Sequence, residues 1–322
     1  MATQERFLVT GALGCIGAWT VRTLVQAGTP VVVFDLGSDP HRLRLILTPD
    51  ELARVQFIQG DITDLDAVEQ SLKATGATHV IHLAALQVPF CRADPSLGAR
   101  VNVVGTVNLF EAARRAGVDR IVYASSVAVF GMGDEYPEDL PDETALLAPR
   151  NLYGVYKQAN EGTARIYWLD HALSSIGLRP HTLYGPGRDQ GMTSGPTKAM
   201  LAAAAGQSYH IPYGGRSGMQ YAEDVARIFI QAAQVPFTGA ELFNMRGSVA
   251  EMAEVVGAIE AVVPAARGTI TFDPQPLPLP AGLDDTRLRT LLGALPDTSL
   301  QDGVQATITL FQQAQADGRL LL

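Results

Sequence analysis

The sequence predicts an α/β protein built on a doubly wound parallel sheet, with a smaller and mainly C-terminal region that binds substrate. Short apolar runs alternate with longer helical patterns through the first half of the chain, which is typical of a parallel sheet with crossover helices. The first of these runs ends in three regularly spaced glycines. The 322 residues, 47% of them hydrophobic and 18% charged, suffice for one large domain or two smaller ones.

Charge and composition narrow the classes of partner. The net charge of -9 argues against a nucleic-acid surface or an anionic membrane as partner. No apolar run approaches membrane-spanning length, and few residues precede the first apolar run, which leaves no room for a signal peptide. Two cysteines provide no disulfide framework. We therefore expect a cytoplasmic protein that acts on a small molecule, without a metal site.

The N-terminal stretch predicts a strand, a tight turn and a helix. The apolar run 7–9 leads into Gly11, Gly14 and Gly17, and an amphipathic segment follows over 18–27. The first glycine permits a sharp turn, the second lets the backbone approach a pyrophosphate, and the third lets the helix pack closely on the strand. The start of the helix, with Cys15 and Ile16, offers N–H groups to phosphates. A glycine triplet alone is a weak signal, so the following segments matter.

The second apolar run, 31–34, ends at Asp35, eighteen residues after Gly17. A carboxylate at this position can accept hydrogen bonds from the ribose hydroxyls of NAD and repels the 2′-phosphate of NADP. The sequence therefore favours NAD, although Arg42 and Arg44 downstream leave NADP open.

Two further strands, over 55–58 and 79–82, are expected to end at the same edge of the sheet. After the first come Asp61, a candidate partner of the adenine amino group, and Ile62; Asp64 is expected to cap the next helix. After the second come Leu83, Ala84 and Ala85, whose small side chains would let the backbone lie close to the cofactor. His82 is interpreted as a packed core residue.

A helix is predicted from Asp94 to about Arg115, carrying Asn102 and ending before Gly117. The strand 120–124 then delivers Ser125 and Ser126 at its end. Ser126 is the preferred candidate for orienting a substrate oxygen, and Ser125 is interpreted as its structural neighbour.

Tyr153 and Lys157 lie near the start of a predicted helix that reaches about Leu173, and their spacing of four places them on one helix face. With nine tyrosines and three lysines in the chain, chance would produce only about 0.1 such pairs. A tyrosine has a pKa of about 10, so a nearby ammonium is needed to make it a base at neutral pH. The pair predicts acid/base chemistry on a hydroxyl or carbonyl group.

In order along the chain, these motifs resemble the extended short-chain dehydrogenases/reductases, in particular the NAD-dependent epimerase/dehydratase family. The matching segments are 11–17, Asp35, 61–62, 82–85, 102–106, 125–131, 153–157, 178–180, 184–188 and 221–226. The resemblance covers most of residues 6–245 and implies a Rossmann fold with bound NAD. It implies Ser126, Tyr153 and Lys157 as catalytic residues, and places Asn102 and His181 near the cofactor. It also implies a homodimer whose interface uses the helices around Asn102 and Tyr153, with Val103, Val107 and Phe110 as candidate contacts.

We expect residues 1–183 to form the NAD-binding domain and 184–322 mainly the substrate-binding region, with 221–245 partly returning to the first. In the second part, helices are expected over 197–205, 223–234, 251–261 and 286–292, and strands over 209–212, 219–221 and 241–245. The loop 185–196 is expected near the substrate, and the proline-rich segment 273–280 is expected to be extended.

Two positions depart from the nucleotide-sugar members of the family. Those enzymes usually have Asn where Thr182 stands, and Arg where Ser217 stands. They also usually carry an Arg-Pro-Gly-Asp segment near the C-terminus, which is absent here. These groups normally hold the nucleotide diphosphate, so a smaller substrate is favoured. The predicted substrate-binding residues are Gln87, Ser126, Tyr153, Thr182, Arg188 and Arg216, of which the two arginines are candidates for an anionic group.

Three functions follow, in order of preference. The first is an NAD-dependent oxidoreductase that transfers hydride at a secondary alcohol or ketone of a small sugar-like or sugar-acid substrate. The second is an NAD-dependent epimerase or dehydratase of a sugar or nucleotide sugar. The third is a non-catalytic NAD-binding protein, which the complete set of Ser126, Tyr153 and Lys157 disfavours.

Overall fold

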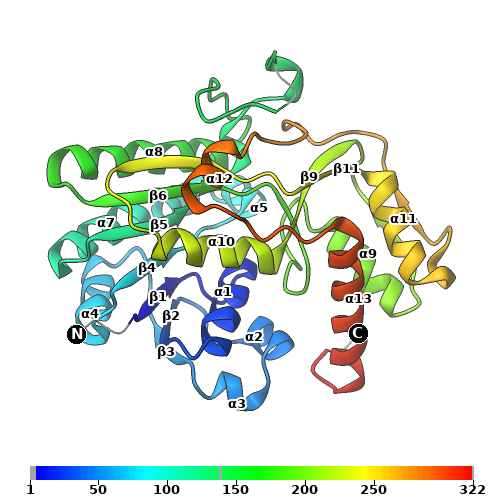
Figure 1. Cartoon of the computed structure of the whole chain (residues 1–322), viewed down its shortest axis with the longest axis horizontal. Helices are drawn as coiled ribbons and strands as arrows, with labels where there is room; N and C mark the ends of the chain where they lie inside the picture. Colours follow the sequence, from blue (N-terminus) through cyan, green and yellow to red (C-terminus); the bar gives the residue numbers. More distant parts are fainter. Residues whose placement is uncertain (1–4, 138–139, 321–322) are drawn as a thin grey trace.

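A computed structural model describes residues 5–137 and 140–320. Its centre is a seven-stranded sheet in the order β10-β6-β5-β4-β1-β2-β3, in which every pair of neighbours is parallel (Figure 1). This confirms the predicted doubly wound sheet. The strands are β1 Phe7–Thr10, β2 Val31–Asp35, β3 Gln56–Gln59, β4 His79–His82, β5 Arg120–Ala124, β6 Ser174–Arg179 and β10 Ala240–Asn244.

Successive side chains of a strand point to opposite faces of a sheet, so alternate residues of the central strands belong to two separate hydrophobic cores. In β1, Phe7 and Val9 join one core and Leu8 joins the other. Helices cover both faces, and those interleaved with the strands are α1 Cys15–Gln26, α2 His41–Ile46, α3 Pro49–Leu52, α4 Leu65–Thr75, α5 Val88–Ala93, α6 Pro95–Ala99, α7 Gly105–Ala116, α8 Leu152–His171 and α10 Ala222–Gln234. The cores hold the sheet rigid, which fixes the positions of its loop ends.

Most of the predicted elements occur within a few residues of their expected ends, and Asp64 caps α4 as predicted by accepting from the Ala67 N–H. The helix predicted over 94–115 is interrupted by a π-helical segment, Arg100–Val104, between α6 and α7. The strand β6 was not predicted, because its Ser-Ser-Ile-Gly start lacks a continuous apolar run.

The second region lies beside the main sheet and contains two small sheets, β11-β9-β7 and β12-β8 (Figure 1). Its elements are β7 Thr182–Tyr184, α9 Gly195–Ala204, β8 Tyr209–Ile211, β9 Arg216–Tyr221, β11 Ser248–Glu251, α11 Met252–Val262, β12 Ile270–Phe272, α12 Thr286–Leu292 and α13 Leu300–Ala316. α13, which packs near α9 and α11 in Figure 1, was not predicted. The division of the chain at residues 183 and 184 stays a prediction, and β10 does join the main sheet.

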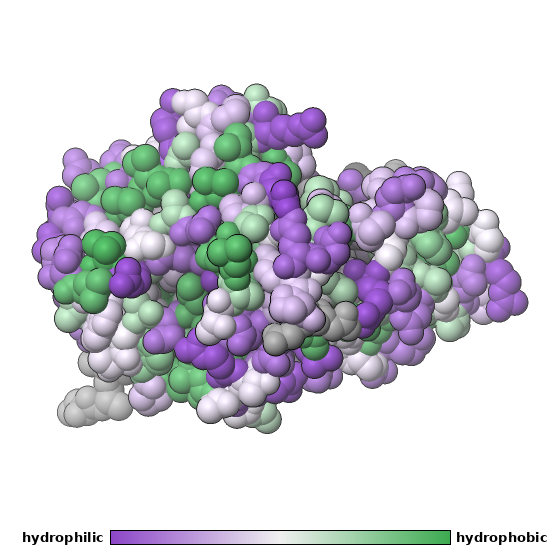
Figure 2. All heavy atoms as spheres, turned by 90° about the horizontal axis from the view of Figure 1, so that it is seen from above, coloured by the Kyte–Doolittle hydropathy of each residue, from purple (hydrophilic) through white to green (hydrophobic). Residues whose placement is uncertain are grey.

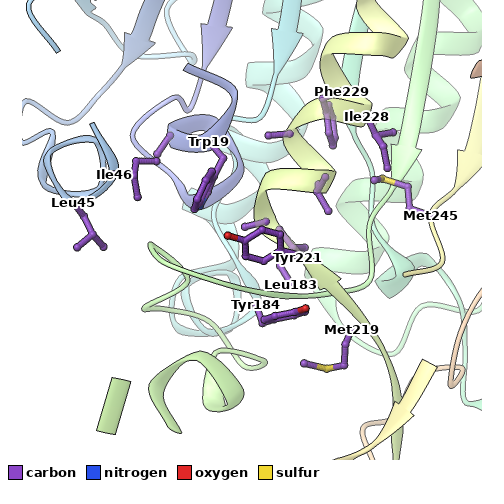
Figure 3. Packing of buried hydrophobic residues seen from close by; sticks show 14 of the residues in the cluster. Trp19, Leu45, Ile46, Leu183, Tyr184, Met219, Tyr221, Ile228, Phe229 and Met245 are labelled. Atoms are coloured by element: carbon purple, nitrogen blue, oxygen red, sulfur yellow. The ribbon is translucent and has the colours of Figure 1, made fainter. Parts of the chain in front are cut away.

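An aromatic cluster ties the two regions together. Trp19 of α1 lies beside Tyr221, and Tyr221 lies beside Tyr184, with ring centres 5.8 and 5.7 Å apart (Figure 3). The Trp19 Nε1–H donates to the Pro186 carbonyl at 2.8 Å, so the loop after β7 is anchored on the helix that follows the glycine turn. This contact brings the predicted substrate loop over the predicted cofactor site.

Candidate active site

A cavity of about 730 Å³ opens at the carboxyl ends of β1, β2, β4 and β5, where ligands bind in open α/β sheets. It brings together nearly all of the residues that the sequence predicts for the site. The predicted residues that line it are Gly11, Gly14, Cys15, Ile16, Gly17, Asp35, Asp61, Ile62, Leu83, Ala84, Ala85, Gln87, Ser126, Tyr153, Lys157, His181, Thr182 and Arg188. Asn102 and Arg216 are predicted residues that do not line it.

The glycine turn forms a cradle in which Gly11 and Gly17 have no room for a side chain against the neighbouring backbone. Gly11 has φ +64°, and a Cβ there would lie 2.5 Å from the Ala84 nitrogen. A Cβ on Gly17 would lie 2.5 Å from the Ala12 Cα. The first turn of a helix leaves its N–H groups without intrahelical acceptors, and in α1 this turn faces the cavity through Cys15 and Ile16. The arrangement fits the pyrophosphate of a dinucleotide.

Asp35 lies at the end of β2, beside this turn. Its Oδ2 accepts from the Leu13 N–H at 2.9 Å and its Oδ1 from the Gly37 N–H at 3.0 Å, which fixes the carboxylate at the cavity wall. Arg42, which the sequence left open as a contact for NADP, instead donates to the Leu13 carbonyl and to Asp189. Arg44 is paired with Asp39.

Asn102 is buried and holds the loop after β4 instead of lining the cavity. Its Oδ1 accepts from the Leu86 N–H at 2.7 Å and its Nδ2 donates to the Leu86 carbonyl at 2.9 Å. Asn102 was predicted to lie near the cofactor, and the structure supports only an indirect effect on that site. Its side-chain amide holds the backbone of Leu86, and the two residues before Leu86, Ala84 and Ala85, line the cavity.

The three predicted catalytic residues meet at the end of β5. Ser126 follows β5 and hydrogen-bonds Tyr153, while Lys157 lies one turn farther along α8. The Lys157 Nζ donates to the Ala124 carbonyl at 2.6 Å and lies 5.6 Å from the centre of the Tyr153 ring. Ser125, the neighbour of Ser126, donates to Glu161 at 2.6 Å and has the structural contact that the sequence assigned to it.

The electrostatics of Tyr153 differ from the expectation. Burial raises the pKa of Tyr153, and the hydrogen bond from Ser126 and the charge of Arg188 only partly oppose this. Burial also lowers the pKa of Lys157 to about 8. The ammonium lies over the ring and is bonded to a carbonyl, so the positive charge that favours the Tyr153 phenolate in this structure comes from Arg188.

Arg188 reaches the cavity from the loop after β7, with neutral partners. It donates to the Thr193 hydroxyl at 2.9 Å and to the Gln87 Oε1 at 3.4 Å. Its Nε is buried and has no hydrogen-bond acceptor among the described residues. A guanidinium that is short of acceptors beside a ligand cavity is suited to bind an anion.

The two positions that differ from nucleotide-sugar enzymes contact each other. The Ser217 hydroxyl donates to the Thr182 hydroxyl at 2.8 Å, and both side chains are buried. Arg216, the residue before Ser217, is exposed at the start of β9, and the structure does not bring it to the cavity. Its proposed contact with substrate therefore gains no support from the geometry.

Two buried histidines are neutral structural groups. His82 lies between the hydroxyls of Thr10 and Thr106 at 2.7 and 3.0 Å, and burial lowers its pKa to about 3. The His181 Nε2–H donates to the Pro280 carbonyl at 2.8 Å, its Nδ1 accepts from the Thr182 N–H, and burial lowers its pKa to about 4. His82 is thus the packed core residue that the sequence indicates, and His181 lines the cavity without a free ring nitrogen.

Three polar residues around the site were not predicted from the sequence. Thr193 and Asp189 come from the loop after β7, and their contacts with Arg188 and Arg42 depend on how that loop folds. Glu161 could have been found, because it follows Lys157 by four residues and so extends the face that carries Tyr153.

Comparison with known proteins identifies the family. Residues 7–245 match the NAD dependent epimerase/dehydratase family. The chain belongs to this family. It is 32% identical to the UDP-glucose 4-epimerase of Mycolicibacterium smegmatis over 318 residues, which cover 95% of this chain and 98% of the relative.

Solved structures agree with this assignment. The UDP-glucose 4-epimerase of Thermus thermophilus in complex with NAD has a TM-score of 0.81 at 27% identity, covering 96% of this chain and all of that one. MoeE5 in complex with UDP-glucuronic acid and NAD has a TM-score of 0.81 at 28% identity, with the same coverage. The protein is therefore an NAD-dependent enzyme of the extended short-chain dehydrogenase/reductase type, and the glycine cradle and Asp35 would hold its NAD.

Proposed function

We propose that this enzyme is a dehydrogenase that transfers hydride at a secondary alcohol, or at the corresponding ketone, of a small polar substrate with a carboxylate, such as a sugar acid. The observation that carries the proposal is the contact between Thr182 and Ser217. Two neutral hydroxyls satisfy each other at the positions where nucleotide-sugar enzymes usually have an amide and a guanidinium. A diphosphate would lose those partners at this place.

Arg188 supports an anionic substrate. Lys157 is bonded to the Ala124 carbonyl, and Arg42 is paired with Asp189, so neither cation is free for a substrate anion. Arg188 faces the same cavity as Tyr153 and has a buried Nε without an acceptor among the described residues. A carboxylate can take two parallel hydrogen bonds from a guanidinium.

In the proposed oxidation, Tyr153 takes the proton of the substrate hydroxyl, and Ser126 aligns that oxygen. Bound NAD supplies the hydride acceptor. Lys157, whose Nζ donates to the Ala124 carbonyl, places a positive charge in the wall of the cavity beside Tyr153. A positively charged Arg188 favours the phenolate form of Tyr153 and at the same time binds the substrate.

The second candidate is an epimerase of a sugar or nucleotide sugar that retains NAD between turnovers. The identity of 32% to a UDP-glucose 4-epimerase over almost the whole chain favours it. The two candidates differ in net chemistry, because a dehydrogenase accumulates NADH and an epimerase does not.

A screen of sugar acids, hydroxy acids, sugars and UDP-sugars with NAD, read by NADH absorbance and by chromatography of the products, tests the proposal. We expect net NADH from a carboxylate-bearing alcohol, and no submillimolar binding of UDP in calorimetry. An isomerised UDP-sugar without NADH, or tight binding of UDP, would establish the epimerase instead.

The role of Arg188 is tested by Arg188→Leu, with Arg216→Leu as the control outside the cavity. Loss of a charged hydrogen bond is worth about 1.5–3 kcal/mol, so kcat/KM for the acid should fall by about 10- to 100-fold in Arg188→Leu. The amide analogue of the substrate should lose less, because it has no carboxylate to lose a partner and is affected only through the effect of Arg188 on Tyr153. An equal loss of kcat/KM for the acid and for its amide would show that Arg188 does not bind the carboxylate.

A further inference from the structure

The end of β5 and the two residues that follow it face α8 at three points. Ala124, the last residue of β5, and the next two residues each face one of three helix residues spaced four apart. The pairs are Ser126 with Tyr153, Ala124 with Lys157, and Ser125 with Glu161. The third pair continues the row of catalytic contacts, although Glu161 itself is not a lining residue of the cavity.

Glu161 is a buried carboxylate held at both oxygens. The Arg179 Nε donates to its Oε1 and the Arg179 Nη2 to its Oε2, each at 2.8 Å, and Ser125 donates to its Oε1 at 2.6 Å. The side chains of Glu161 and Arg179 are 5% and 1% exposed. Such a geometry satisfies both carboxylate oxygens with charge-assisted hydrogen bonds and prevents movement of the side chain.

Stability alone does not account for this pair. A well-packed apolar pair is often as stable as a buried ion pair, because removing two charges from water costs more than their attraction returns. The ion pair must therefore be considered with its neighbours, and the nearest functional group on the same helix face is Lys157.

Four titratable groups face Lys157. They are Cys91 from α5, His82 from β4, and Tyr153 and Glu161 from α8. Burial raises the pKa of Cys91 and of Tyr153, and lowers that of His82 to about 3, so these three are neutral at pH 7. Glu161 is the remaining group that can carry negative charge toward the buried ammonium.

We propose that Glu161 is a positioning residue of the active site, whose carboxylate, fixed by Arg179 and Ser125, keeps the buried Lys157 in its charged form. Burial opposes the ammonium, and the carboxylate compensates for part of that penalty. Arg179 and Ser125 fix the position of the Glu161 carboxylate on the helix face that also carries Lys157.

The three lysines of the chain make a direct test possible. In protein whose lysines carry ¹³C at Cε, NMR titration should show Lys157 with a midpoint near pH 8. Glu161→Gln should move the Lys157 midpoint to lower pH. The matched control is Glu69→Gln, which removes the carboxylate partner of Lys73 on another helix and should leave the Lys157 midpoint in place.

Two further variants keep the test decisive. Glu161→Gln leaves Arg179 unpaired, and if that variant fails to fold, Glu161→Gln combined with Arg179→Met removes both buried charges and should still lower the midpoint. Ser125→Ala keeps the carboxylate and should leave the midpoint unchanged. An unmoved Lys157 midpoint in folded protein without Glu161, or an equal shift in Ser125→Ala, would overturn the proposal. The readout needs no substrate, so its outcome is independent of the proposed reaction.

Discussion

At the scale of single residues, the site depends on how burial and charge compete at Tyr153. The phenol lies against the protein wall, which raises its pKa, while the hydroxyl of Ser126 and the charge of Arg188 act in the opposite direction. The acid/base role that we propose for Tyr153 therefore depends on positive charge near the phenol, as Arg188 supplies.

Tyr153→Phe preserves the shape of the ring and removes the acid/base group. We expect NAD affinity to stay nearly unchanged and turnover to fall by about 100-fold or more, the usual contribution of a positioned general base. Single-turnover kinetics and fluorescence titration with NADH measure the two quantities. Tyr156→Phe is the control, because Tyr156 donates to the Pro95 carbonyl instead of facing the cavity. Near-native turnover in folded, NAD-bound Tyr153→Phe would refute the mechanism.

At the scale of elements, hydrogen bonds through neutral histidines join segments that lie far apart in the chain. His82 links β4 to Thr10 of β1 and to Thr106 of α7. Thr106 in turn donates to the carbonyl of Asn102, whose amide holds the loop after β4. The wall of the cavity near Ala84 thus depends on His82 remaining uncharged.

This linkage predicts acid sensitivity. The pKa of His82 is about 3 in the folded protein, below the value of about 6.5 in the unfolded chain. Between pH 6.5 and pH 3, His82 is therefore protonated in the unfolded chain and neutral in the folded protein, which favours unfolding as the pH falls. Stability from this group is complete above pH 6.5 and is lost below it. His82→Gln should make the fall in unfolding free energy shallower by about 1.4 kcal/mol per pH unit between pH 6 and 4.

Urea unfolding at a series of pH values measures this slope. A slope in His82→Gln equal to that of the native protein would show that His82 is not the group responsible.

At the scale of the whole molecule, apolar side chains lie exposed along the helices that the family resemblance assigns to a dimer. They are Val104, Val107, Leu152, Val155, Ile166 and Leu169, each between 37 and 60% exposed. Figure 2 shows the molecule from above relative to Figure 1, and hydrophobic residues gather on the left half of that view. Phe110, a candidate contact in the sequence, is instead fully buried against Tyr123 and Tyr167.

We propose that these exposed residues form a homodimer interface. Ile166→Asp combined with Val107→Asp should shift the mass from dimer to monomer in light scattering at micromolar concentration, because charges in the centre of an apolar interface are costly. Phe57→Ser, on the opposite edge strand β3, should leave the mass unchanged. A monomeric native protein under the same conditions would contradict the proposal.

Within residues 5–137 and 140–320, no helix is long and apolar enough to cross a membrane. The cytoplasmic location and the absence of a nucleic-acid partner remain predictions from composition.

Features that depend on residues close together in the chain can be predicted from the sequence. The turn at Gly11, the carboxylate at the end of β2 and the four-residue spacing of Tyr153 and Lys157 are local patterns, and the alternation of strands and helices follows from short-range hydrophobic periodicity. For these features the sheet and most of the cavity wall could be predicted.

The contacts between side chains that are far apart in the chain could not be predicted, because they depend on how distant elements pack. Asn102 reaches the backbone of Leu86, sixteen residues away, and Ser217 meets Thr182 across thirty-five. Whether an arginine faces a cavity, as Arg188 does, or solvent, as Arg216 does, depends on loop paths and on the packing of distant elements. The physical reason is that a buried polar group must find its partner wherever the fold supplies one, and sequence spacing does not encode that distance.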